Sequence, residues 1–406
     1  MISIEEAIQT IKNNIPEPKL ELRKTYDCVD YYLAQDVYSN LDSPYFDNSA
    51  MDGFAISLED VEELLQNSKE IVLDMIGTSK AGSPFDSFIS KNQCVQINTG
   101  AKIPINTGAI VPIENVEFLD SEKTKIKIKQ IKKKFQNIRK KGEEIQKGQV
   151  LFNKNTCLNV NQISFLLQNN ISEIFVYKKP KVLLITTGSE LVSYKETLTE
   201  EDLQNGRIIN TNSFTISYFL DKFRIEHYKA LDIKDEEKAI YKVIEKYYDE
   251  VDIIIITGGV SVGPYDYVKQ DVENFGFIPL FWKINQKPGK PFYFAKKENK
   301  LLFGLPGNPV SSYISFYHYV LPAIRFFDSR IWFENKIQLK SEEEIINKGD
   351  RDTFYTIKRI GENRFILYKQ QGSYMLSSLA YTEGYILVRV NQTIQKEEKT
   401  DCYLWI

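Results

Sequence analysis

Two stretches decide the fold: residues 253–267, IIIITGGVSVGPYDY, and residues 301–313, LLFGLPGNPVSSY. Each is a short apolar run that leads through a Gly-rich turn into a helix-like segment. Backbone N–H groups and the helix N-terminus converge at such a turn, which favours a bound anion. With KPGKP (287–291) between them, the two turns predict a site for a phosphorylated or oxyanionic ligand.

Strand-like and helix-like segments alternate around these turns. This alternation predicts a doubly wound, mostly parallel sheet that binds ligands at the carboxyl ends of its strands. Outside it, the chain predicts a small N-terminal α/β domain, an all-β insert and a C-terminal β domain. Ser3 and Glu6 form a capping box for a first helix, and residues 41–56 predict a loop. The expected domains are 1–46 with 138–177, 47–137, 178–328 and 329–406.

Composition excludes several classes of protein. The chain has 406 residues, a net charge of −3 and a pI of about 5.8, so no basic field indicates nucleic acid. The Lys-rich stretch 123–141 predicts a half-buried strand with solvated lysines, and the alternative is weak attraction for an anionic ligand or an acidic partner. We expect no signal peptide and no membrane span. Four scattered cysteines and two histidines indicate a reducing cytoplasm and no zinc site.

The Gly-rich turns supply the candidate ligand-binding residues. Asn308 and Pro309 fit the N-cap and first position of a helix, and Gly307 lets the backbone approach a ligand. An ordinary strand–helix connection explains the same residues, so each turn alone is weak evidence. The candidate residues are Gly258, Gly259, Ser261, Gly263, Gly307, Asn308, Pro309 and Ser311.

Charged residues near the turns fit an anion and a divalent metal. Lys287 and Lys290 lie on a loop that prolines stiffen, which suits a multiply charged anion, although incidental surface lysines explain the pattern as well. Glu190 follows the first strand and Asp266 follows a Gly-rich turn. Glu190 fits a hydrogen bond from a ribose hydroxyl, Mg²⁺ binding or an ordinary place in a helix's first turn, and Asp266 fits Mg²⁺ binding or a helix cap. We find no catalytic Ser–His–Asp set, P-loop or GxGxxG motif.

Taken in order, eight segments resemble the molybdopterin molybdenumtransferase family, the MoeA-like proteins related to the gephyrin E domain. The resemblance covers nearly the whole chain. The segments are FDNSAMDGFAI (46–56), INTGAKIP (97–104), IRKKGEEIQKGQ (138–149), TTGSEL (186–191), GRIINTNS (206–213), TGGVSVGPYDY (257–267), KPGKP (287–291) and GLPGNPVSS (304–312).

The resemblance implies an enzyme that inserts molybdate into adenylylated molybdopterin and releases AMP with the help of Mg²⁺. It also implies an elongated homodimer whose cleft lies between the doubly wound domain of one subunit and the β insert of the other. Its partners would be a molybdopterin adenylyltransferase upstream and molybdoenzyme apoproteins downstream, with no nucleic acid or membrane.

Residue by residue, the resemblance assigns a catalytic set and a metal set. The sequence departs from the family at Glu144, which replaces an aspartate, and at Ser189, which replaces another. The expected catalytic residues are Asp52, Thr99, Glu144, Glu190, Asp235, Lys287 and Lys290. The expected Mg²⁺ ligands are Asp52, Glu190 and Asp266.

Three other functions stay open at this point. A molybdopterin adenylyltransferase would share the doubly wound domain but would lack residues 40–170 and the C-terminal β domain. A non-catalytic molybdopterin-binding scaffold would keep the fold without the reaction. A tungstate-specific homologue would run the same reaction, and the residues do not discriminate between oxyanions of nearly equal size and charge.

Overall fold

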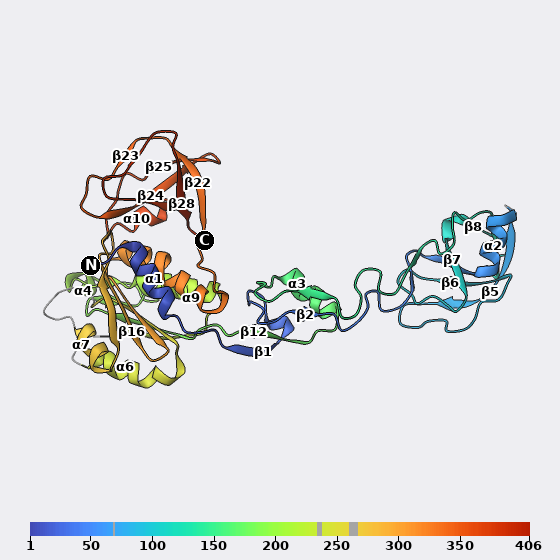
Figure 1. Cartoon of the computed structure of the whole chain (residues 1–406), viewed down its shortest axis with the longest axis horizontal. Helices are drawn as coiled ribbons and strands as arrows, with labels where there is room; N and C mark the ends of the chain where they lie inside the picture. The colour runs from blue at the N-terminus through green and yellow to red at the C-terminus, as the bar shows by residue number, and fades with distance from the viewer. Residues whose placement is uncertain (68–69, 234–237, 260–266) are drawn as a thin grey trace. The chain divides into compact units, whose positions relative to one another are not determined.

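The computed structural model describes residues 1–67, 70–233, 238–259 and 267–406 (Figure 1). The chain divides into two compact units, which we describe separately. The first contains Met1–Glu21, Asp30–Tyr32 and Val176–Ile406, and the second contains Leu22–Val29 and Leu33–Phe175. Both α/β and β architecture are present, as predicted, while the boundaries of the four expected domains remain predictions. In the described residues, no helix combines the length and apolarity that a membrane span needs.

A six-stranded sheet forms the centre of the first unit, in the order β16-β13-β17-β21-β20-β18. Its first four strands pair in parallel. β20 pairs antiparallel with β21 on one side and with β18 on the other. This confirms the mostly parallel sheet. The strands are β13 (Val182–Thr187), β16 (His227–Ile233), β17 (Ile253–Thr257), β18 (Ile278–Lys283), β20 (Pro291–Lys297) and β21 (Lys300–Leu305), with a separate parallel pair β14 (Leu191–Val192) and β15 (Ile208–Ile209).

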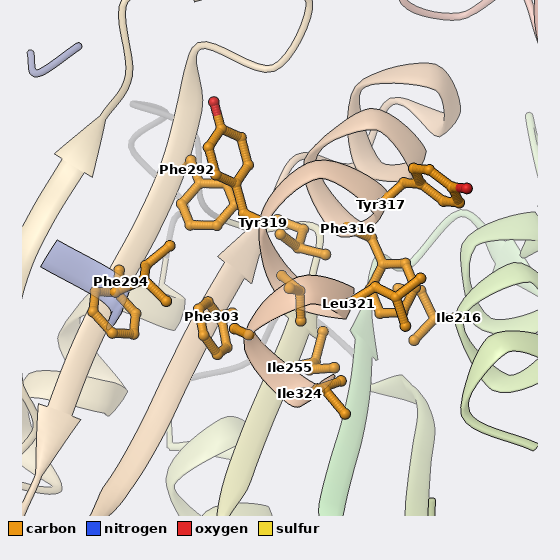
Figure 2. Packing of buried hydrophobic residues seen from close by; sticks show 14 of the residues in the cluster. Ile216, Ile255, Phe292, Phe294, Phe303, Phe316, Tyr317, Tyr319, Leu321 and Ile324 are labelled. Carbon is orange, nitrogen blue, oxygen red and sulfur yellow. The ribbon is translucent and has the colours of Figure 1, made fainter. Parts of the chain in front are cut away.

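Helices cover both faces of this sheet because successive side chains of each buried strand point to opposite faces. Ile255 packs with Ile216 and Ile324 on one face (Figure 2). Ile254 packs with Ile244 on the other. The helical segments of this unit are α1 (Ile4–Asn14), α4 (Glu200–Gln204), α5 (Thr211–Lys222), α6 (Ala239–Tyr247), η3 (Tyr248–Glu250), α7 (Tyr267–Asn274), α8 (Pro309–Ser315), the π-helix η4 (Phe316–Val320), α9 (Leu321–Ser329) and α10 (Ser377–Ala380).

The predicted C-terminal β segments form a second sheet of the first unit, in the order β19-β24-β25-β22-β28-β26. A further pairing of β24 with β26 closes five of these strands into a ring. The sixth strand, β19, precedes the KPGKP loop and pairs Lys287 with Thr353 in parallel register. The strands are β19 (Gln286–Lys287), β22 (Lys336–Ser341), β24 (Asp352–Ile360), β25 (Arg364–Leu367), β26 (Gly384–Val388) and β28 (Lys399–Leu404), beside the pair β23 (Ile345–Ile346) and β27 (Thr393–Ile394).

The second unit contains a six-stranded sheet in the order β7-β4-β6-β5-β9-β8. Ile126 and Ile128 are fully buried, which confirms a strand with a solvated lysine face in the Lys-rich stretch. The strands are β4 (Gly53–Ser57), β5 (Ile71–Ser79), β6 (Gln93–Ile97), β7 (Thr107–Pro112), β8 (Val116–Phe118) and β9 (Lys125–Ile128).

Two expectations for this region are wrong. The insert is not all β, because α2 (Leu58–Asn67) buries Val61 and Leu64 at helical spacing. The expected loop 41–56 contains β3 and the start of β4, because Gly53 to Ile56 pair with two neighbouring strands. The other elements are β1 (Leu20–Lys24), η1 (Thr25–Asp27), β2 (Val37–Tyr38), β3 (Asn48–Ser49), η2 (Ile113–Asn115), β10 (Ile138–Arg139), β11 (Val150–Phe152), α3 (Val160–Gln168) and β12 (Glu173–Tyr177).

Candidate active site

The first cavity lies where the parallel strands β13, β17 and β21 end, and it measures about 430 Å³. The turns after these strands form its wall, as the alternating pattern predicted. Among the predicted site residues, those that line it are Glu190, Gly258, Gly259, Gly307, Asn308, Pro309 and Ser311. Segments far apart in the sequence therefore meet at one ligand-sized hollow.

Gly258 is fixed by its surroundings. Its φ is +88°, and a Cβ on it would lie 2.4 Å from the backbone oxygen of Thr187. A side chain therefore meets both backbone strain and a clash with a neighbouring strand end. Gly307 is less constrained, since among the described residues a Cβ there would meet only the Gly258 Cα, at 3.7 Å. The sequence interpretation singled out Gly307 for close backbone approach, but the structure puts the stricter requirement on Gly258.

Asn308 occupies the N-cap position of α8, and Pro309 is the first helical residue, as predicted. The Asn308 side chain, however, makes no capping hydrogen bond. Its Nδ2 instead lies 3.4 Å from Oγ of Ser373, which belongs to the loop before α10. The prediction that Asn308 caps the helix is therefore wrong for the side chain, which links the turn to the C-terminal region.

Thr187, Asn210 and Asn212 line this cavity but did not appear among the predicted site residues. Thr187 has a buried hydroxyl with no hydrogen-bond partner among the described residues, so it is free to bond to a ligand. Asn212 donates from Nδ2 to the Gly307 carbonyl at 2.8 Å. Asn210 donates to the Thr186 hydroxyl at 2.8 Å and caps α5. The sequence signal for the two asparagines was the segment NTNS at 210–213.

A second cavity, of about 540 Å³, adjoins the first because Pro291, Asn308 and Ser311 line both. Lys287 and Lys290 line this cavity, so the structure brings the predicted basic pair to one hollow. Arg351, from the segment before β24, adds a third cation that sequence reasoning missed. The local sequence around Arg351 does not indicate a site, because Arg351 lies near the lysines through the pairing of β19 with β24.

Asp52 and Thr99 lie together in the second unit. The Asp52 carboxylate accepts from the Thr99 backbone N–H at 2.7 Å and from its hydroxyl at 3.2 Å. These bonds, the backbone one first, lower the pKa of Asp52 below its ordinary value because they stabilise the charged form. Asp52 is therefore an ionised acceptor at neutral pH.

We expect Thr99→Val to raise the pKa of Asp52 partway towards the ordinary aspartate value, because the backbone N–H remains while the hydroxyl is lost. Since the folded-state pKa is depressed, any stability from this contact is present above the ordinary pKa and is lost as the pH falls through the folded-state value. Carboxyl NMR titration measures the shift. The pKa of Asp120, which Thr124 lowers in the same unit, is the internal control. An unchanged Asp52 pKa would contradict the role of the hydroxyl.

Glu144 lies on a third cavity, of about 650 Å³, in the second unit. Its Oε2 accepts a 2.8 Å hydrogen bond from the Ser43 hydroxyl. Gly100, which directly follows Thr99, lines the same cavity together with Arg139 and Glu143. The longer side chain at position 144 thus still presents a carboxylate on the face that carries the Thr99 turn.

Four predicted site residues lie outside the described part of the chain: Asp235, Ser261, Gly263 and Asp266. Of the expected Mg²⁺ ligands, Glu190 lines the first cavity and Asp52 belongs to the second unit. Within the described ranges, no group of three His, Cys, Asp or Glu residues is placed to hold a metal ion. The Mg²⁺ ligand set therefore stays a prediction.

The fold and cavities define an α/β protein with two adjoining cavities at the carboxyl ends of a doubly wound sheet. Residues 2–169 match the family described as MoeA N-terminal region (domain I and II), and residues 183–325 match a probable molybdopterin binding domain. A molybdopterin molybdenumtransferase from Haemophilus influenzae is 32% identical over 96% of this chain and 94% of its own. One from Staphylococcus epidermidis is 35% identical over 80% of this chain and 75% of its own.

Solved structures agree in fold. The crystal structure of a molybdopterin biosynthesis MoeA protein from Pyrococcus horikoshii has a TM-score of 0.76 and 28% identity, and covers 100% of both chains. The chain belongs to the molybdopterin molybdenumtransferase family and is an enzyme of that class.

Proposed function

We propose that this enzyme inserts molybdate into adenylylated molybdopterin in molybdenum cofactor biosynthesis, with cleavage of the adenylate and release of AMP. The observation that carries the proposal is the pair of adjoining cavities. One is walled by Gly-rich turns and the other contains three cationic side chains. Because Pro291, Asn308 and Ser311 line both, a ligand in one cavity lies beside a ligand in the other.

The first cavity suits the pyrophosphate of the adenylylated pterin. Gly-rich turns and the start of α8 form one wall, a setting that favours phosphate oxygens, while the Gly258 and Val310 N–H groups already donate to the Leu305 and Ser373 carbonyls. The Thr187 hydroxyl, buried without a partner among the described residues, supplies a further donor. These groups bind and orient the phosphates without changing protonation state.

The second cavity suits a dianionic oxyanion. Lys287, Lys290 and Arg351 attract molybdate by charge, and Ser311 supplies a hydroxyl on the side shared with the first cavity. The lysines also offset negative charge that develops when the phosphoanhydride bond breaks. This arrangement holds the oxyanion next to the dithiolene end of a pterin bound in the neighbouring cavity.

Mg²⁺ fits the oxygen donors at the first cavity. Glu190 gives a carboxylate there, and Mg²⁺ prefers one or two carboxylates combined with substrate phosphates. When bound, the ion polarises a phosphoryl oxygen for cleavage. Asp52 and Asp266 complete the proposed ligand set.

We further propose a cytoplasmic homodimer in which Asp52, Thr99 and Glu144 of one subunit serve the cavities of the other. The support is that these carboxylate and hydroxyl groups lie in a different compact unit from Glu190 and the lysines. A molybdopterin adenylyltransferase supplies the substrate, and molybdoenzyme apoproteins receive the product.

The test is a reconstitution that follows AMP release from adenylylated molybdopterin with Mg²⁺ and either molybdate or tungstate. We expect AMP release that depends on the oxyanion, and the two rates rank the metals. Omission of the oxyanion and addition of EDTA are the controls. AMP release that is independent of any oxyanion, or no release despite tight pterin binding, would contradict the proposal.

A further inference from the structure

A buried amide, that of Gln286, supports the loop Lys287–Pro291 from within the protein. Gln286, which directly precedes the loop, is fully buried. Its Nε2 donates to the Pro288 carbonyl at 3.2 Å and to the Gly289 carbonyl at 3.1 Å. Both N–H groups of the amide are therefore used to hold the two residues that separate Lys287 from Lys290.

A tyrosine from the π-helix η4 fixes the orientation of this amide. The Tyr319 hydroxyl donates to Oε1 of Gln286, which leaves Nε2 facing the loop carbonyls. The Tyr319 ring packs against Phe292 at a centroid distance of 5.1 Å, and Figure 2 shows its hydroxyl directed away from the apolar cluster. Burial holds the pKa of Tyr319 well above its ordinary value, so the hydroxyl stays protonated and donates.

The loop fits tightly on this support. A Cβ on Gly289, whose φ is +88°, would lie 2.8 Å from Gln286 Nε2 and 2.7 Å from Ser315 Oγ. The backbone must therefore come close to the amide, and glycine permits this approach. The pairing of Lys287 with Thr353 holds the beginning of the loop as well.

This support has an electrostatic consequence for the second cavity. Pro288 and Gly289 line that cavity, whereas Gln286 lies behind them and outside the lining. Carbonyl oxygens that bond to the buried amide point their negative ends away from the cavity. Without the amide they are free to turn towards a bound oxyanion, which they repel, and the buried carbonyl groups lose their hydrogen bonds.

We propose that Gln286, oriented by Tyr319, is a positioning residue that presents Lys287 and Lys290 to the oxyanion and turns the carbonyls between them away from it. The inference rests on the proposed function, since it concerns the same oxyanion. Gln286 touches no substrate, so its effect reaches the oxyanion through the two lysines and leaves ligand affinity at the first cavity unchanged.

The test compares Gln286→Met, which keeps similar length but lacks the amide, with the wild-type enzyme. We expect the Kd for molybdate, measured by calorimetry, and the KM for molybdate in AMP release to rise about tenfold, which corresponds to about 1.4 kcal/mol. The affinity for AMP, the probe of the first cavity, should stay at its wild-type value. A purely structural defect would instead lower the unfolding temperature and weaken both ligands.

Tyr319→Phe and the double variant probe the link between the two residues. Because Tyr319 acts through Gln286, the double variant should bind molybdate no more weakly than Gln286→Met alone. Tyr293→Phe is the matched control, because Tyr293 is also buried but packs in the cluster on the other face of the sheet, with its hydroxyl 3.5 Å from Glu273. It should leave molybdate affinity unchanged.

Two outcomes distinguish a failure of the positioning role from a failure of the proposed function. If wild-type enzyme binds molybdate and releases AMP while Gln286→Met has the same molybdate Kd and KM, the positioning role is wrong and the proposed function stands. If wild-type enzyme binds no molybdate and releases no AMP, the proposed function fails, and this inference fails with it.

Discussion

Replacing Lys290 with alanine will lower kcat/KM for molybdate-dependent AMP release by about 100-fold or more, the usual loss when one group that stabilises developing charge is removed. Lys290 lines the second cavity, and its exposed side chain supports no core. Its backbone carbonyl accepts from the Ile284 N–H at 3.1 Å, a bond that alanine keeps. The fold should therefore survive while the oxyanion loses a cation.

Steady-state rates against molybdate concentration, with thermal unfolding in parallel, measure this effect. Lys396→Ala is the control, since Lys396 is an exposed lysine that does not line the cavity. If Lys290→Ala released AMP at the wild-type rate at low molybdate, Lys290 would have no role in the reaction. A large fall in unfolding temperature would show that the side chain has a structural role instead.

Gly258→Ala will both destabilise the first unit and abolish ligand binding at the first cavity. Its φ of +88° and the 2.4 Å approach of a Cβ to the Thr187 carbonyl leave no room for a methyl group. Left-handed backbone strain alone costs on the order of 2 kcal/mol for a residue other than glycine. Relief requires the turn to move away from β13, which separates the backbone donors from the Thr187 hydroxyl.

Urea unfolding gives the change in the free energy of unfolding, and calorimetry with AMP gives the loss of binding. Gly307→Ala is the matched control for stability, because its nearest neighbour is the Gly258 Cα at an ordinary 3.7 Å and its φ is not in the left-handed region. Equal stabilities for the two variants would show that the Gly258 turn relaxes at no cost. The structural account of that turn would then be wrong.

The parallel sheet of the first unit could be predicted because its signals are local. Buried runs such as Ile253–Thr257 end in Gly-rich turns and lead to helices, and residues at the carboxyl ends of β13, β17 and β21 line the cavity. The helix α2 was also visible in the spacing of Val61 and Leu64, but the strands around it obscured the pattern. The expected loop at 41–56 failed because Gly53 to Ile56 gain their strand conformation from long-range pairing.

Some parts of the site could not be predicted from the sequence, and each of them depends on contacts between distant segments. Arg351 lines the same cavity as the lysines because β19 pairs with β24. A single arginine in a polar stretch of sequence does not indicate this pairing. Thr187 stands out only because the fold buries its hydroxyl without a partner among the described residues. The contact between Tyr319 and Gln286 needs the register of a π-helix, which has no clear sequence signature.

The pairing of β19 with β24 has a consequence for truncated forms of the chain. A premature stop codon between the end of α9 and residue 351 leaves every strand of the parallel sheet encoded, together with both lysines. It nevertheless deletes Arg351, Ser373 and the strand against which Lys287 is paired. Such a product would keep the wall of the first cavity and lose one side of the second cavity. The second cavity is thus encoded jointly by two segments of the gene, and neither segment builds it alone.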